Sequence, residues 1–94
     1  MVQPIETLSR ESISSMSDKE IVDELLKLLV RVVPHDIKTC EMSTFLIEDI
    51  GIDSLGTYEL MMDAEDRFGI EIADEQLMEL KQIKDLVALV RSYS

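Results

Sequence analysis

Apolar residues recur at helical spacing along this 94-residue chain, and no segment shows the strict alternation of a β-strand. The first such segment covers residues 18–33 and is followed by Pro34, which disfavours a helical conformation at the residue before it. Ser17 and Glu20 have the identity and spacing of a capping box. We therefore predict an amphipathic helix whose apolar face consists of Ile21, Val22, Leu25, Leu26, Leu29 and Val33.

Three further segments show helical patterns: residues 54–68, a short stretch over 74–80 that begins at Asp74, and residues 82–91. The first has a core face of Thr57, Leu60, Met61, Ala64 and Phe68, and the last has one of Ile83, Leu86, Val87 and Val90. The predicted fold class is all-α, a small antiparallel four-helix bundle with three longer helices and one short helix. The length fits a single domain.

Two parts of the chain lack a sustained period. Residues 1–16 are polar and rich in Ser, which predicts a flexible tail before a helical domain over residues 17–94. Residues 34–53 form a long connection that ends in a turn at Gly51 and a helix cap at Asp53. We expect its apolar residues to fix it to the core: Phe45, Leu46, Ile47, Ile50 and Ile52.

The formal net charge of −11 restricts the classes of partner. Such a charge repels nucleic acids and anionic membrane surfaces, and it favours proteins with basic docking patches. Cys40 is the single cysteine, so no disulfide forms within the chain, and its thiol has no catalytic partner nearby in the sequence. With no apolar leader segment near Met1, we expect a cytoplasmic protein.

The helix predicted over residues 54–68 has a second, narrow apolar stripe. At ~100° per residue, Leu55, Tyr58 and Met62 lie on the side opposite the core face. Exposed apolar side chains with a polar rim are typical of surfaces that bind partners. The flanking carboxylates are Glu59, Asp63, Glu65 and Asp66.

Ser54 stands at the start of this helix, and three roles can be compared. A catalytic serine is disfavoured, because Ile52 replaces the first glycine of a G-x-S-x-G motif and the one histidine, His35, lies in the long connection. An EF-hand calcium loop fails whether counted from Asp49 or from Asp53. A helix N-cap explains a serine, but not the apolar stripe that follows it.

The stretch EDIGIDSLGTYELMMDAEDRFGIEIADEQ resembles the central half of an acyl carrier protein. Asp53, Ser54 and Leu55 match the Asp-Ser-Leu signature at the start of that family's second helix. FLIEDIGI resembles the segment before the signature, and FGIEIADEQ resembles the link to the family's short third helix. The likeness extends from about Asp18 to Tyr93.

This resemblance implies that Ser54 carries 4′-phosphopantetheine, transferred from coenzyme A by a phosphopantetheinyl transferase. It implies a carrier rather than an enzyme, with acyl intermediates held as thioesters for fatty-acid or polyketide-type biosynthesis. The expected partners are acyltransferase, ketosynthase or ligase-type enzymes with basic patches, and we expect a monomer without a metal site. The docking face would comprise Leu55, Tyr58, Glu59, Met62, Asp63, Glu65 and Asp66.

The chain departs from the pattern of fatty-acid carriers at four positions. Gly56 replaces a common Asp, Tyr58 a small aliphatic residue and Ala73 a common Pro, and Lys81 offers no cap for the last helix. These departures favour a discrete carrier of a polyketide or related specialised pathway. Two alternatives remain open: a peptidyl or aminoacyl carrier, and an acidic docking subunit of the same fold that never carries the arm.

Overall fold

The computed structural model describes residues 6–33, 37 and 40–93 of the chain. In this part of the chain the regular elements are helical, apart from one isolated bridge between Phe45 and Gln82. The elements are α1 (Arg10–Ser15), α2 (Asp18–Val32), a π-helical turn η1 (Leu46–Ile50), α3 (Ser54–Phe68), α4 (Asp74–Leu77) and α5 (Ile83–Ser92). The predicted all-α class is confirmed.

The longer helices form where their local signals predict them. At the start of α2, the Ser17 side chain accepts a hydrogen bond from the Glu20 N–H, and the Glu20 carboxylate accepts one from the Ser17 N–H. α3 has the bounds predicted for it, α2 ends one residue before its predicted end, and α5 begins and ends one residue later than predicted. α4 ends at Leu77, three residues before its predicted end. Pro34 and His35 lie outside the described residues.

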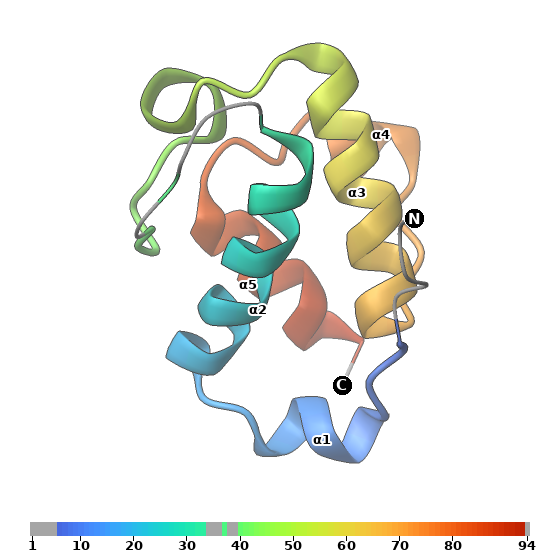
Figure 1. Cartoon of the computed structure of the whole chain (residues 1–94). Helices are drawn as coiled ribbons and strands as arrows, with labels where there is room; N and C mark the ends of the chain where they lie inside the picture. Colours follow the sequence, from blue (N-terminus) through green and yellow to red (C-terminus); the bar gives the residue numbers. More distant parts are fainter. Residues whose placement is uncertain (1–5, 34–36, 38–39, 94) are drawn as a thin grey trace.

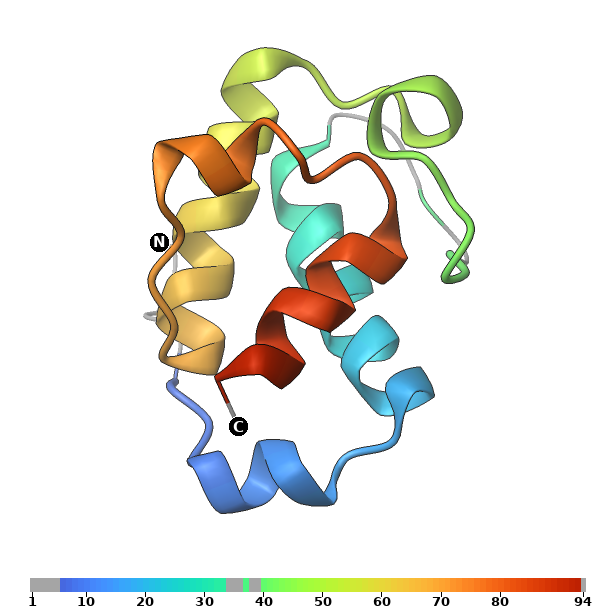
Figure 2. The same ribbon diagram turned by 180° about the vertical axis from the view of Figure 1, so that it is seen from behind.

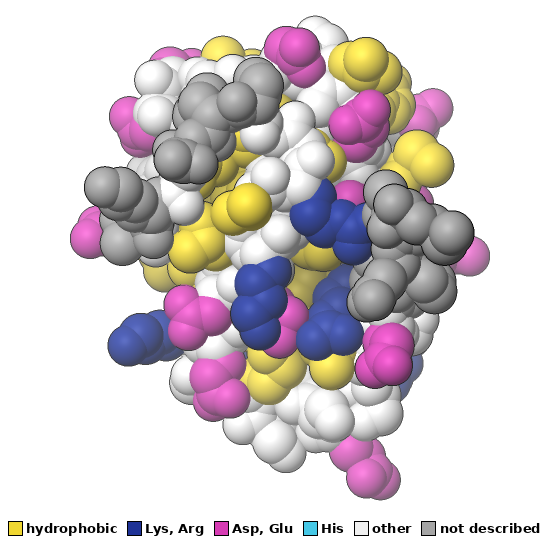
Figure 3. All heavy atoms as spheres, viewed as in Figure 1, with side chains coloured by type: hydrophobic (Ala, Val, Ile, Leu, Met, Phe, Trp, Pro, Cys, Tyr) yellow, Lys and Arg dark blue, Asp and Glu magenta, His cyan; other side chains and the backbone are white. Residues whose placement is uncertain are grey.

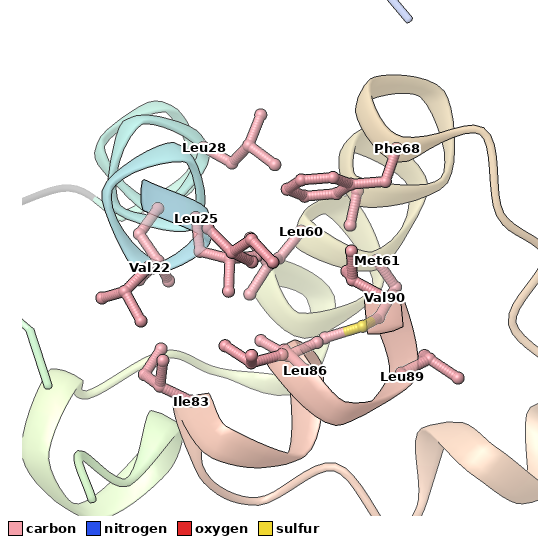
Figure 4. Close-up of a cluster of buried hydrophobic side chains, with 14 of the residues drawn as sticks. Val22, Leu25, Leu28, Leu60, Met61, Phe68, Ile83, Leu86, Leu89 and Val90 are labelled. Carbon is pink, nitrogen blue, oxygen red and sulfur yellow. The ribbon is translucent and has the colours of Figure 1, made fainter. Parts of the chain in front are cut away.

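α2 and α3 lie side by side and run antiparallel (Figure 1). α5 packs across both of them and is nearest the viewer in Figure 2. Side chains of the three helices point toward one another in the core (Figure 4). The buried set comprises Ile21, Val22, Leu25, Leu28 and Leu29 of α2, Leu60, Met61, Ala64 and Phe68 of α3, and Ile83, Leu86, Val87, Leu89 and Val90 of α5.

The segment before α2 corrects one prediction. A flexible tail was predicted over residues 1–16, but within residues 6–16 the chain forms α1, whose Ile13 is 1% exposed and belongs to the core. The side chain of Ser9 caps this helix by accepting a hydrogen bond from the Ser12 N–H. The prediction is wrong for residues 6–16 because a six-residue helix with one buried side chain produces no periodic pattern. Residues 1–5 lie outside the described residues.

The long connection contains the π-helical turn η1, which the sequence did not predict. The Phe45 N–H donates to the Asp49 carboxylate (2.9 Å), and Gly51 ends the turn with a φ of 82°, a conformation that favours glycine. Three of the five expected apolar contacts are confirmed, because Leu46, Ile50 and Ile52 are buried. The other two are wrong: Phe45 and Ile47 are exposed.

An ion pair joins α2 to α3 away from the core. Arg67 donates to both carboxylate oxygens of Glu24, with N–O distances of 3.2 Å, and the Lys27 ammonium lies 3.4 Å from the same carboxylate. The Arg67 guanidinium thus pairs with a carboxylate of the neighbouring helix. The two helices are therefore linked by charge as well as by the core.

We expect Glu24 to stabilise the fold at neutral pH more than in acid. Burial raises the pKa of Glu24, but the hydrogen bonds and charges of Arg67 and Lys27 outweigh it, so this pKa lies below its ordinary value. A carboxyl group with a lower pKa in the folded state adds stability above its unfolded pKa, and this is lost as pH falls through the folded pKa. Glu24→Gln should cost about 1.5 kcal/mol at neutral pH, the lower end for hydrogen bonds to charged groups, because solvent reaches the pair.

The measurement is the free energy of urea unfolding at neutral and acid pH. Glu79→Gln is the matched control, since it makes the same charge change at an exposed residue. The cost of Glu24→Gln should shrink in acid, whereas the control should show little cost at either pH. An equal cost of Glu24→Gln at both pH values would contradict the ionic contribution.

No helix in the described ranges combines the length and apolar character needed to cross a membrane.

Candidate functional site

Ser54 is the first residue of α3, at the end of the bundle opposite α1 (Figure 1). Asp53 caps the helix: its carboxylate accepts a hydrogen bond from the Gly56 N–H (2.6 Å) and its carbonyl accepts one from the Thr57 N–H (2.9 Å). The Ser54 side chain is exposed, and its hydroxyl makes no hydrogen bond to any other described residue. Because Asp53 is the cap, the structure leaves Ser54 without a capping role.

Gly56 is buried in the first turn of α3. A Cβ atom at this position would lie 2.9 Å from Cγ1 of Ile52 and 3.0 Å from a carboxylate oxygen of Asp53. Ile52 is itself 3% exposed, so its side chain has little room to move. The glycine therefore permits a close contact between the start of α3 and the residues that precede it.

We expect Gly56→Ala to destabilise the protein slightly or leave its stability unchanged. Helix propensity alone favours alanine by about 1 kcal/mol. Overpacking against Ile52 costs about 1–3 kcal/mol and offsets that gain. Thermal melts would measure the net effect. A rise in melting temperature of the size expected from propensity would mean that Ile52 moves aside at no cost.

The second apolar stripe of α3 is exposed, in agreement with the wheel geometry of the sequence. Leu55 is 69%, Tyr58 54% and Met62 62% exposed, while the opposite face of the helix is buried. Thr57, predicted to be in the core, is half-buried. Figure 3 shows hydrophobic and acidic side chains next to each other on the outer side of α3.

The four carboxylates that flank this stripe differ in their environments. Glu59 and Asp66 are exposed, and Asp63 is half-buried. Glu65 is half-buried too, and its carboxylate accepts a hydrogen bond from the Ile72 N–H (2.8 Å). Glu65 therefore fixes the chain that follows α3, and this contact competes with its predicted role in docking.

Arg31, on the wet side of α2, lies beside the acidic rim. It lines a groove between α2 and α3 together with Val32, Glu59, Met62 and Asp63. Burial and the Asp66 charge raise the pKa of Asp63, and the nearby Arg31 charge lowers it. The raising effects are larger, so this pKa lies above its ordinary value. In Figure 3 several Lys and Arg side chains gather between α2 and α3. The sequence assigned no docking role to Arg31, because its nearness to α3 depends on helix packing.

An open cleft of about 420 Å³ adjoins Ser54. It is lined by Leu46, Ile47 and Glu48 of η1, by Ser54, Thr57 and Tyr58 of α3, and by Leu77, Met78, Leu80 and Lys81 in and after α4. Ile47 and Met78 are 64% and 80% exposed. They extend the apolar surface around Ser54 beyond the stripe of α3. Neither residue was predicted at this site from the sequence. Ile47 was expected to contact the core, and Met78 lay in a predicted helix whose faces were not assigned.

Within the described residues, no group of His, Cys, Asp or Glu side chains is arranged to hold a metal ion. Cys40 is a free, half-buried thiol that does not line the cleft beside Ser54. Burial and the nearby Asp23 charge raise the pKa of the Cys40 thiol, which lowers its thiolate fraction at neutral pH. Ser54 thus places an exposed hydroxyl beside the cleft.

Comparison with known proteins agrees with this arrangement. Residues 20–90 match the family model described as the phosphopantetheine attachment site. The acyl carrier protein of Thermobifida fusca is 38% identical over 77 residues, which cover 80% of this chain and 95% of that protein. The acyl carrier protein of Coprothermobacter proteolyticus is 34% identical over 77 residues, with coverages of 82% and 94%.

The fold has a counterpart among solved structures. A provisionally assigned acyl carrier protein of Mycobacterium tuberculosis superposes with a TM-score of 0.69 at 22% identity, covering 83% of this chain and all of that one. This likeness supports the fold alone, whereas the family model and the curated relatives support the family. Together with the matched attachment domain, they show that the chain belongs to the acyl carrier protein family, whose members carry 4′-phosphopantetheine.

Proposed function

We propose that this chain is a discrete acyl carrier and that Ser54 is its attachment residue for 4′-phosphopantetheine. The observation that carries the proposal is the exposed Ser54 hydroxyl at the first turn of α3, beside an open, largely apolar cleft. Asp53 occupies the cap position, so the serine side chain is free for modification. When bound, the group would supply a thiol that holds acyl intermediates as thioesters.

The start of α3 suits a phosphodiester at Ser54. The Gly56 and Thr57 N–H groups already bond to Asp53, whereas those of Ser54 and Leu55 have no acceptor among the described residues. Free N–H groups and the partial positive charge at a helix N-terminus favour a bound anion. The residues present therefore fit the group. Leu46 of η1 and Leu77 of α4 both line the cleft and would keep water from the acyl chain next to the arm.

A specialised pathway, such as polyketide synthesis, is the proposed setting. Gly56 is packed against Ile52, so the aspartate of fatty-acid carriers would require Ile52 to move. Tyr58, in place of a small aliphatic residue, lines the cleft at Ser54. The exposed Tyr58 therefore changes the surface that a partner and a cargo meet, whereas the buried Gly56 changes how the first turn of α3 packs. We further propose that the carrier acts as a monomer in the cytoplasm, the compartment that fits its single cysteine.

The test of the carrier function is the intact mass of the protein purified from its native host. This measurement reports the arm and its cargo together. An acyl group on the arm supports the proposal, and an aminoacyl group would indicate a peptidyl carrier. A chain that carries no arm while its transferase is active would favour the acidic docking subunit.

Partner docking is proposed for the outer face of α3. Leu55, Tyr58 and Met62 would form the short-range contact, and Glu59, Asp63 and Asp66 would attract basic patches on partner enzymes. We leave Glu65 out of this surface because of its hydrogen bond to Ile72. A phosphopantetheinyl transferase would be the first partner, followed by acyltransferase, ketosynthase or ligase-type enzymes.

We expect Glu59→Lys and Met62→Ala to impair docking in different ways. Charges at the rim of an interface act mainly on the association rate, whereas buried contacts act on dissociation. Glu59→Lys should slow loading of the arm most clearly at low salt. Met62→Ala should weaken the complex at every salt concentration, by about 1–2 kcal/mol if the side chain is largely buried on docking. Loading kinetics across a salt series would separate the two effects.

Thermal melts serve as the control, because Glu59 and Met62 are both exposed and both variants should melt close to wild type. Glu79→Lys repeats the charge change at an exposed position after α4. Normal loading of both test variants at every salt concentration would contradict the proposed docking face.

A further inference from the structure

The N-terminal segment, residues 6–16, contacts the end of α3 that lies farthest from Ser54. The Thr7 hydroxyl donates to the Asp66 carbonyl (2.6 Å), and the Leu8 N–H donates to the Arg67 carbonyl (2.7 Å). Arg67 in turn donates to the Glu6 carbonyl (3.0 Å). Figures 1 and 2 both show α1 across this end of the bundle.

α1 is held in place from two sides. Ile13 is buried in the core, and the Arg91 guanidinium of α5 donates to the Met16 carbonyl (2.7 Å) and the Ile13 carbonyl (3.4 Å). These contacts fix the backbone of α1 against the bundle. Arg10, in its first turn, is therefore held over the residues that follow α3.

Arg10 and Tyr93 meet on the link between α3 and α4, residues 69–73. The Arg10 guanidinium donates to the Tyr93 carbonyl and to the Gly69 carbonyl (3.5 Å), and it lies 5.8 Å from the centre of the Tyr93 ring. The Tyr93 hydroxyl donates to the Glu71 carbonyl (2.5 Å). The start of the link is thus bonded to the ends of both α1 and α5.

These bonds matter because α4 lacks buried side chains of its own. From residue 71 to residue 82 every side chain is exposed or half-buried, whereas Ile70 and Ile83 on either side are buried. At the far end, the Leu46 N–H donates to the Lys81 carbonyl (2.9 Å) and the Ile83 N–H to the Thr44 carbonyl (3.0 Å). α4 and its flanks contact the core only through partly buried side chains, those of Ile72, Leu77 and Leu80. Hydrogen bonds on either side of α4, including that from the Ile72 N–H to Glu65, therefore help to set its position.

α4 and the residues after it form one wall of the cleft beside Ser54, through Leu77, Met78 and Leu80. We propose that Arg10 and Tyr93 are positioning residues: by fixing the link, they set the volume of this cleft and so limit the length of the acyl chain that it shelters. The inference rests on the proposed carrier function. Neither residue lines the cleft, so both act through α4.

The first experiment uses the full chain without the arm, so that it is independent of the carrier function. Amide hydrogen exchange is measured in wild type, Arg10→Ala and Tyr93→Phe. Exchange at the hydrogen-bonded amides of Leu77, Met78 and Glu79 should become about tenfold faster, the effect of losing one hydrogen bond that holds a locally opening segment. Arg10→Lys should restore part of the protection.

Two control variants separate this local effect from others. Lys19→Ala removes a positive charge at an exposed residue of α2 and should leave α4 unchanged. Val22→Ala truncates a buried side chain of α2 and should raise exchange across α2, α3 and α5 as well as α4. The positioning role is overturned if Arg10→Ala and Tyr93→Phe raise the rate of amide exchange in α4 by no more than they raise it in α2, α3 and α5.

The second experiment loads wild type and Tyr93→Phe with saturated acyl chains of increasing length on the phosphopantetheine arm. The gain in melting temperature over the unloaded arm should peak at one chain length in wild type and at a longer one in Tyr93→Phe. An unchanged peak despite faster exchange in α4 would overturn the limit on chain length. Failure of the wild type to accept the arm would overturn the carrier function, and with it the cargo limit, but not the exchange result.

Discussion

Treatment with a broad-specificity phosphopantetheinyl transferase, coenzyme A and Mg²⁺ is expected to add one phosphopantetheine group to the wild-type chain and none to S54A. The Ser54 hydroxyl is exposed and makes no hydrogen bond within the described residues. Its removal should therefore change the stability by no more than about 0.5 kcal/mol, as for most surface substitutions. Intact mass spectrometry measures the modification, and a thermal melt confirms that S54A is folded.

Ser43→Ala is the matched control, because Ser43 is another exposed serine, located before η1. This variant should gain the same mass as wild type. A mass gain on S54A, or an unmodified wild-type chain next to a carrier that the same enzyme does modify, would contradict the attachment at Ser54.

Phe68→Ala is expected to destabilise the fold by about 3–5 kcal/mol, the usual cost of removing a buried phenylalanine ring. Phe68 is 1% exposed, and its ring points toward Leu28 of α2 (Figure 4). Small domains are stable by about 5–15 kcal/mol, so the variant should lose a large share of its stability. Urea unfolding followed by circular dichroism would measure the loss.

Tyr58→Ala is the matched control on the opposite face of the same helix, where Tyr58 is 54% exposed. Removing this ring should change the stability by about 0.5 kcal/mol or less, because no cavity is formed. An equal loss of unfolding free energy in Phe68→Ala and Tyr58→Ala would contradict the assignment of one face of α3 to the core and the other to solvent.

The sequence by itself determined the elements whose signals are local. α2 begins at Asp18 because the two hydrogen bonds of its capping box join Ser17 and Glu20, and α3 begins at Ser54 because Asp53 caps it. The division of α3 into a buried and an exposed face follows from the helical repeat alone. The Asp-Ser-Leu signature and the exposed stripe of α3 could therefore be recognised from the sequence alone.

Only the tertiary structure decided the features that depend on residues far apart in the chain. Arg10 bonds to Tyr93, 83 positions away, and Thr7 bonds to Asp66, 59 positions away, so no pattern near Arg10 could reveal that the N-terminal segment is ordered. Arg31 lines a groove with Glu59, Met62 and Asp63 because α2 packs beside α3. Bonds within a few residues are fixed by local sequence, whereas these long-range contacts exist only after the helices have packed.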